Sequence, residues 1–182
     1  MGIGNSTSAC AVACAVLGLS VEDAVGIGTG VGSATRRRKA EVITEALHHH
    51  RDQLDSPLSI LATLGGYEIA GLVGLIEAAA ARSIPVLLDG FITGAAALIA
   101  ARLNPDTRRV MIAATRSSEP AHQAILDALE LEPLLDLGIR LGEGAAAGLA
   151  LPLVRASCRS MAEMCTFEEA GIPEPMDPIG RQ

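Results

Sequence analysis

Pro85-Val86-Leu87-Leu88-Asp89-Gly90 gives the clearest indication of the fold class. It is a short apolar run ended by Asp-Gly, which is the pattern of a strand buried on both faces. A helical pattern follows at residues 94–103, and residues 109–114 form a second apolar run of the same kind. Another helical pattern covers residues 120–129. This strand–helix–strand–helix order is typical of a parallel sheet covered by helices.

Outward from this unit the pattern is helical. Helices are predicted at residues 6–17, 34–54, 59–64 and 68–81 before the first strand, and at 144–164 near the end. We therefore predict the α/β class, with a Rossmann-like parallel sheet covered by helices and a carboxy-terminal helical segment. Residues 1–182 are interpreted as a single α/β domain, in which 144–182 form a helix plus an irregular tail.

The composition excludes several classes of protein. A net charge of −7 argues against duplex nucleic acid, and two Phe and one Tyr are too few rings for a single-strand stacking platform. The apolar residues 67–81 carry two glutamates and are too short to span a bilayer. The start has no basic region before its apolar run, as a signal peptide would. These features predict a soluble cytoplasmic protein that binds neither nucleic acid nor membrane.

Two sets of metal-ligand residue types have simpler interpretations. The four cysteines form no Cys-x-x-Cys pair and are interpreted as reduced, buried small apolar residues. They are Cys10, Cys14, Cys158 and Cys165. Three consecutive histidines at 48–50 point in different directions on a helix, so a solvated patch is favoured over a metal site.

Two glycine-rich loops precede helices. Gly2-Ile3-Gly4-Asn5 leads into the first helix, and a helix start offers unpaired backbone amides to a phosphate. The second loop covers residues 26–32. Neither loop has the spacing of the dinucleotide fingerprint or of a Walker loop, which disfavours a generic nucleotide-binding oxidoreductase. Each loop taken alone is more often an ordinary tight turn than a phosphate site.

Single charged residues suggest chemistry beside these loops. Lys39 lies one helical turn before the apolar Ile43, so it is the member of the run 36–39 that we expect to face inward and meet a phosphate. The other members of the run fit a solvated face. Glu143, flanked by glycines, could take a proton from a ring nitrogen. The alternative for Glu143 is a helix-start acid favoured by the helix dipole.

Ligands in parallel sheets bind beyond the carboxyl ends of the strands. Residues 89–91 and 115–117 follow the two predicted strands and are therefore candidate site loops. Ser117, His122 and Asp127 have the residue types of a hydrolytic triad, but no nucleophile elbow supports one. The residues alone thus predict an anion-binding α/β enzyme.

The order of the motifs is more specific than any one of them. Gly-Ile-Gly-Asn-Ser-Thr-Ser (2–8), Gly-x-Gly-Thr-Gly followed by Lys39, and Gly-Gly-Tyr-Glu-Ile-Ala-Gly (65–71) come first. Leu-Asp-Gly-Phe (88–91), Arg-Ser-Ser-Glu-Pro with His122, and Ile-Arg-Leu-Gly-Glu-Gly (139–144) complete the series. In this order the chain resembles the nicotinate-nucleotide–dimethylbenzimidazole phosphoribosyltransferase family over nearly all its length.

The resemblance implies a reaction and its residues. Nicotinate mononucleotide gives its ribose phosphate to dimethylbenzimidazole, yielding α-ribazole phosphate and nicotinate for the nucleotide loop of cobalamin. The resemblance implies no cofactor and no metal, because the pyridinium leaving group is already activated. It assigns the general base to Glu143. The residues it implies for the substrate are Gly2, Gly4 and Asn5, Lys39 and Ser117 at the phosphate, and Asp89 and Gly90 beside the nucleotide.

The resemblance also implies a homodimer and a longer sequence. The amino-terminal half of the family fold, which supplies much of the benzimidazole pocket, has no counterpart in these residues. An alternative to the complete enzyme is therefore a truncated, non-catalytic fragment that binds the nucleotide or depends on a partner.

Overall fold

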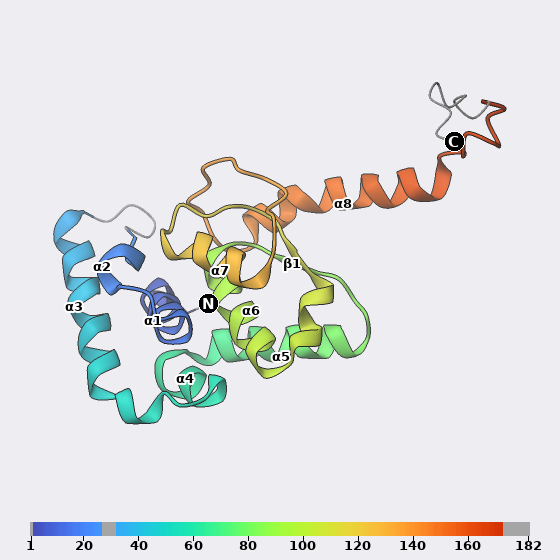
Figure 1. The fold of residues 1–182 in the computed structure, drawn as a ribbon. Helices are drawn as coiled ribbons and strands as arrows, with labels where there is room; N and C mark the ends of the chain where they lie inside the picture. The colour runs from blue at the N-terminus through green and yellow to red at the C-terminus, as the bar shows by residue number, and fades with distance from the viewer. Residues whose placement is uncertain (1, 27–31, 173–182) are drawn as a thin grey trace, which may run out of the picture. The chain divides into compact units, whose positions relative to one another are not determined.

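The computed structural model describes residues 2–26 and 32–172 (Figure 1). The chain divides into two compact units, residues 1–150 and residues 151–182. Most of the predicted second glycine loop, residues 27–31, and the predicted irregular tail from residue 173 lie outside the described residues.

The larger unit contains the predicted parallel sheet. Strands β1 (Val86–Leu88) and β2 (Met111–Ala113) pair in parallel, with Leu87 opposite Ile112. Helix α6 (Phe91–Leu103) and the 3-10 helix η2 (Pro105–Val110) connect them, as a parallel pair requires. A bridge between Thr115 and Leu135 extends the parallel pairing on the far side of β2. The α/β class with a small parallel sheet is thus confirmed.

The second strand begins later than predicted. Residues 109 and 110 belong to η2 rather than to a strand. Asn104 starts this 3-10 helix, because its side chain accepts a hydrogen bond from the amide of Asp106 at 3.1 Å and Pro105 follows at the first position. The helix keeps its geometry as far as Val110, so the apolar run enters the sheet only at Met111.

The predicted helices are present with small shifts at their ends. They are α1 (Asn5–Leu17), α3 (Ser33–His49), α4 (Pro57–Leu64), α5 (Tyr67–Ala81) and α7 (Ala121–Leu129). Helix α4 begins two residues early because Ser56 and Ser59 form a capping box and Pro57 fits the first turn. The pattern did not indicate α2 (Val21–Ala24) or η1 (Arg51–Gln53), which ends the predicted long helix.

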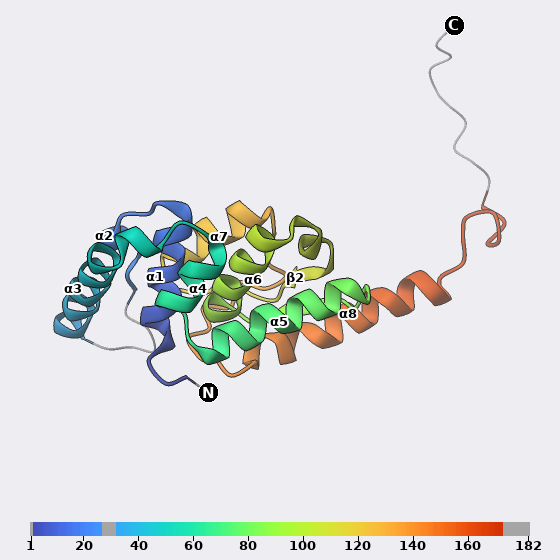
Figure 2. The same cartoon turned by 90° about the horizontal axis from the view of Figure 1, so that it is seen from below.

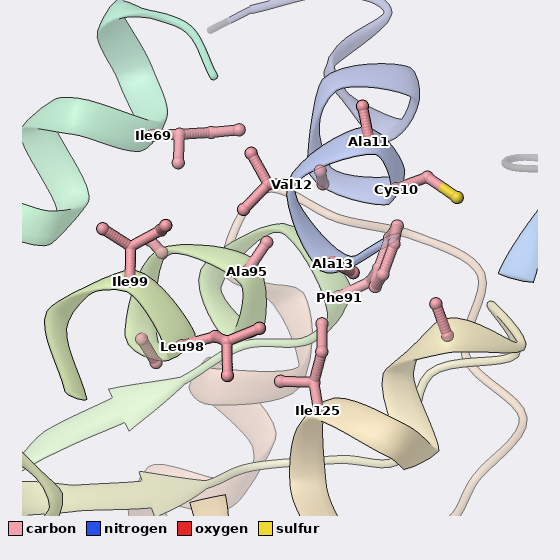
Figure 3. Close-up of a cluster of buried hydrophobic side chains, with 14 of the residues drawn as sticks. Cys10, Ala11, Val12, Ala13, Ile69, Phe91, Ala95, Leu98, Ile99 and Ile125 are labelled. Carbon is pink, nitrogen blue, oxygen red and sulfur yellow. The ribbon is translucent and has the colours of Figure 1, made fainter. Parts of the chain in front are cut away.

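The core of the larger unit forms around α1 and α6. In Figures 1 and 2, α1 lies between α3 and α6. Figure 3 shows Val12 and Ala13 of α1 close to Ala95 of α6, with Phe91 and Ile125 nearby. Residues 95–101 of α6 are all buried, and most of them are alanines, whose small side chains let neighbouring helices approach closely.

Two of the four cysteines contradict the prediction of burial. Cys10 and Cys14 are free and buried in α1, as predicted. Cys158 and Cys165 are free but exposed. The prediction is wrong there because residues 151–172 bury very few of their own side chains.

The last helix, α8 (Ala145–Glu163), confirms the prediction for 144–164 within one residue at each end. Its first six residues belong to the larger unit, where Ala146 and Ala150 pack against Ala114. In the smaller unit, the exposed Arg159 Nε lies 3.0 Å from Glu163 Oε1, one turn along the helix. No helix among residues 2–26 and 32–172 is long and apolar enough to cross a membrane.

Candidate active site

The ends of the two strands bring Gly90 and Ser117 together. Gly90 follows β1, and Ser117 follows β2 by four residues. A Cβ built on Gly90 would lie 3.9 Å from Ser117 Cβ, which is van der Waals contact, so the two residues are neighbours. The two candidate loops therefore meet at the carboxyl edge of the sheet, where ligands of parallel sheets bind.

His122 organises the loop that carries Ser117. Its Nδ1 accepts a hydrogen bond from the backbone amide of Ser117 at 2.9 Å, and Ser117 Oγ accepts one from the amide of Glu119 at 3.3 Å. A ring nitrogen that accepts must be unprotonated, so His122 is neutral here. Burial, and after it the positive charge of Arg116, lower the pKa of His122 to about 4. The imidazole acts on the backbone of Ser117, which gives no support to a hydrolytic triad.

We expect acid to destabilise the protein through His122, by on the order of 3 kcal/mol between pH 7 and pH 4. An ordinary histidine titrates near pH 6.5, whereas folded His122 binds its proton only near pH 4. Between these values the unfolded chain binds more protons, so this stability is complete above pH 6.5 and falls as the pH drops. Urea denaturation at both pH values measures the loss. In His122→Asn the pH-dependent loss should be smaller by the same amount, and an equal loss would contradict the assignment.

Lys39 faces inward, in contrast to its neighbours. Its side chain is 7% exposed, whereas residues 36–38 are exposed. The ammonium lies 3.5 Å from Glu119 Oε2, in the same loop as Ser117, and donates no hydrogen bond to a described residue. A Cβ on Gly26 would lie 2.5 Å from both Glu119 carboxylate oxygens, so the carboxylate packs closely against the backbone of Gly26. The pattern argument for an inward Lys39 agrees with the structure, and its contact with a phosphate stays a prediction.

The loop of Gly2, Gly4 and Asn5 leads into α1 as predicted. Gly2 and Gly4 have positive φ of 49° and 89°, and the amide of Asn5 donates to the Gly2 carbonyl at 3.0 Å. No described side chain caps the helix at Gly4. Gly2 lies directly against the carboxylate of Glu68, so this loop contacts the start of α5. Sequence reasoning gave Glu68 no place at the site, although it stands in the quoted 65–71 motif.

Glu143 lies in a strained turn just before α8. It is exposed, and its φ of 64° is left-handed, which costs about 1–2 kcal/mol in a residue with a side chain. Gly144 follows with φ of 82°, and the amide of Ala145 donates to the Gly142 carbonyl at 3.3 Å. Backbone strain of this kind is concentrated at functional sites.

Asp89 connects this turn to the sheet. Its Oδ1 accepts a hydrogen bond from the backbone amide of Ala147 at 3.0 Å, across 58 positions of sequence. The start of α8 is thereby fixed to the end of β1, next to Gly90. Of the predicted residues, the structure brings together Asp89, Gly90, Ser117 and, through Glu119, Lys39. His122 and Glu119 were not predicted as site residues, although both follow Ser117 in the quoted motif.

A parallel sheet whose strand ends lie beside a buried lysine and a helix start is typical of α/β enzymes that bind anions. The model of a family described as Phosphoribosyltransferase (DBI_PRT) matches residues 1–172. The chain belongs to the nicotinate-nucleotide–dimethylbenzimidazole phosphoribosyltransferase family. The resemblance predicted from the motifs is thus confirmed.

In alignments with similar proteins, nearly all of this chain matches about half of the other protein. The nicotinate-nucleotide–dimethylbenzimidazole phosphoribosyltransferase of Shewanella amazonensis is 51% identical over 96% of this chain and 51% of its own. The Chloroflexus aurantiacus protein of that name is 49% identical over 96% and 50%. The crystal structure of CobT from Thermus thermophilus superposes with a TM-score of 0.89 and 42% identity, covering 94% of this chain and 51% of its own. The chain spans about half the length of the curated relatives it matches.

Proposed function

We propose that this chain transfers the phosphoribosyl group of nicotinate mononucleotide to dimethylbenzimidazole, as a cytoplasmic homodimer in cobalamin assembly. The relatives' names specify these two substrates. The Glu143 turn carries the proposal, because a strained, glycine-flanked carboxylate stands at the start of a helix that is tied to the strand end. We also propose that residues 1–182 form one partial phosphoribosyltransferase domain.

In the proposed reaction, a benzimidazole nitrogen forms a bond to the anomeric carbon of the ribose. The bond from that carbon to the pyridinium nitrogen breaks, and its electron pair stays on nicotinate. Attack from the opposite face inverts β to α. The second benzimidazole nitrogen then loses its proton to the Glu143 carboxylate. This side chain is exposed and can accept the proton.

The phosphate is assigned to the groups around Ser117. Lys39 supports this assignment, because its ammonium is buried and has hydrogen-bond donors that no described residue accepts. The start of α1, with Gly2, Gly4 and Asn5, has no described side-chain cap, and we assign it to the phosphate because helix starts attract anions. Asp89 and Gly90 are assigned to the strand end beside the nucleotide, where Gly90 brings no side chain.

The experiment is chromatographic detection of α-ribazole phosphate after incubation of the purified chain with both substrates. Product formation supports transfer by this chain alone. A folded sample that forms no product contradicts the self-sufficient enzyme.

A partner-dependent fragment is the second candidate, favoured by apolar surface in the larger unit. Tyr67 is 97% exposed and Leu75 is 53% exposed on the same face of α5, two turns apart. Contiguous exposed apolar surface marks interaction sites, and in this alternative these two side chains belong to the surface that a partner covers. If the chain is inactive alone but forms product when the separately produced amino-terminal half of a relative is added, the fragment interpretation is correct.

A further inference from the structure

Helix α8 starts without a local side-chain cap. Gly144 stands immediately before Ala145, and its carbonyl accepts the amide of Gly148 at 2.8 Å, so it has the position of an N-cap residue. Glycine has no side chain with which to accept an amide of the first turn. The first-turn amide of Ala147 therefore takes its acceptor from another element of the fold.

That acceptor is the Oδ1 atom of Asp89. Asp89 is half-buried directly after β1, and its carboxylate lies 3.0 Å from the Ala147 nitrogen. A carboxylate at this place is also favoured by the positive end of the helix dipole. Ala146 and Ala150 hold the same end of α8 against the sheet through their contact with Ala114. Two contacts therefore fix the start of the helix. These are the packing of its alanines against Ala114 and the hydrogen bond between Asp89 and the Ala147 amide.

Glu143 depends on this anchor because only Gly144 separates it from α8. Glu143 and Gly144 both have positive φ and form a tight turn into the helix. A shift of the helix start therefore changes the direction of the Glu143 side chain. We propose that Asp89 is a positioning residue, which caps α8 from the strand end and so holds Glu143 where the substrates meet. The inference rests on the proposed function for the role of Glu143, while the cap itself does not depend on it.

Asp89→Asn and Asp89→Ala separate positioning from direct binding. Asparagine keeps an Oδ1 acceptor of the same reach, whereas alanine removes it. In Asp89→Ala we expect hydrogen exchange at the Ala147 amide to become about tenfold faster, with amides of α6 unchanged as the internal reference. The amide chemical shifts of Glu143 and Gly144 should move in the same variant. In Asp89→Asn both readouts should stay near those of the wild type.

Kinetics give the second readout. Asp89→Ala should lower kcat about tenfold with the KM for nicotinate mononucleotide unchanged, and Asp89→Asn should lose at most about threefold. Unchanged Ala147 exchange in Asp89→Ala overturns the cap. An equal rise of KM in both variants also overturns the proposal, because it shows that substrate needs the charge. If Asp89→Ala does not fold, Asp89→Ser, whose hydroxyl is too short to reach, replaces it.

An inactive wild type would refute the proposed function, but the role of Asp89 as the cap of α8 could still be tested. The exchange and chemical-shift comparison needs no turnover, so it still shows whether Asp89 fixes the Glu143 turn.

Discussion

Glu143→Gln lowers the rate of α-ribazole phosphate formation by about 10²–10⁴-fold, if Glu143 takes the benzimidazole proton. The amide has nearly the same shape as the carboxylate but cannot accept a proton at neutral pH. The turn keeps its geometry, so binding of nicotinate mononucleotide should be unchanged. Initial rates at saturating substrate, together with calorimetric titration of the nucleotide, measure the two effects separately.

Glu130→Gln is the matched control. Glu130 is also an exposed glutamate with left-handed φ, 58°, and it ends α7. Its partner is Arg108, 3.3 Å away. The same chemical change at the same backbone conformation should leave the rate within about twofold, because a surface ion pair contributes little. Equal losses in the two variants would show that the effect of Glu143→Gln is not general base catalysis.

Lys39→Met destabilises the protein by about 3–5 kcal/mol. Lys39 and Glu119 have side chains only 7% and 8% exposed, and the substitution removes the cation that faces the buried carboxylate at 3.5 Å. Loss of this cation takes away one of the interactions that compensate the buried carboxylate, which costs free energy. Urea denaturation at pH 7 measures the change in the free energy of unfolding.

Two variants test the cause of that loss. In the double variant Lys39→Met with Glu119→Gln, most of the stability should return, because neither charge is then buried. Arg38→Met removes the neighbouring exposed pair with Glu41, 3.4 Å apart, and should cost less than about 1 kcal/mol. A Lys39→Met protein as stable as Arg38→Met would contradict the buried pair.

Local sequence patterns predicted the elements well. The apolar run at 86–88 ends in Asp-Gly and is the strand β1, and the small apolar residues of 94–103 form the buried helix α6. Both patterns show that the segment is buried, and they do so without depending on which element it packs against. The errors lie where a side chain acts on a neighbouring backbone. Asn104 turns residues 109 and 110 into a 3-10 helix, and hydropathy does not register that contact.

The site could be predicted only in part. Residue type and position beside helix starts or strand ends predicted glycines, one lysine and one glutamate as candidates. Their partners were not predicted, because pairs such as Lys39 with Glu119 or Asp89 with Ala147 are distant in sequence and meet only through the sheet. His122 stands at helical spacing from Ile125, Leu126 and Leu129, which indicates a buried face, but its bond to the Ser117 amide required the fold.

The most direct test is a titration of the isotope-labelled chain with nicotinate mononucleotide, followed by amide chemical shifts. The central claim is that the strand ends, the Lys39–Glu119 pair and the Glu143 turn form one nucleotide site. We predict that the amide signals of Gly90, Ser117 and Glu143 shift with one common dissociation constant. Lys39→Met should raise this dissociation constant. Shifts confined to other surfaces, or an absence of binding by the folded chain, would contradict the claim.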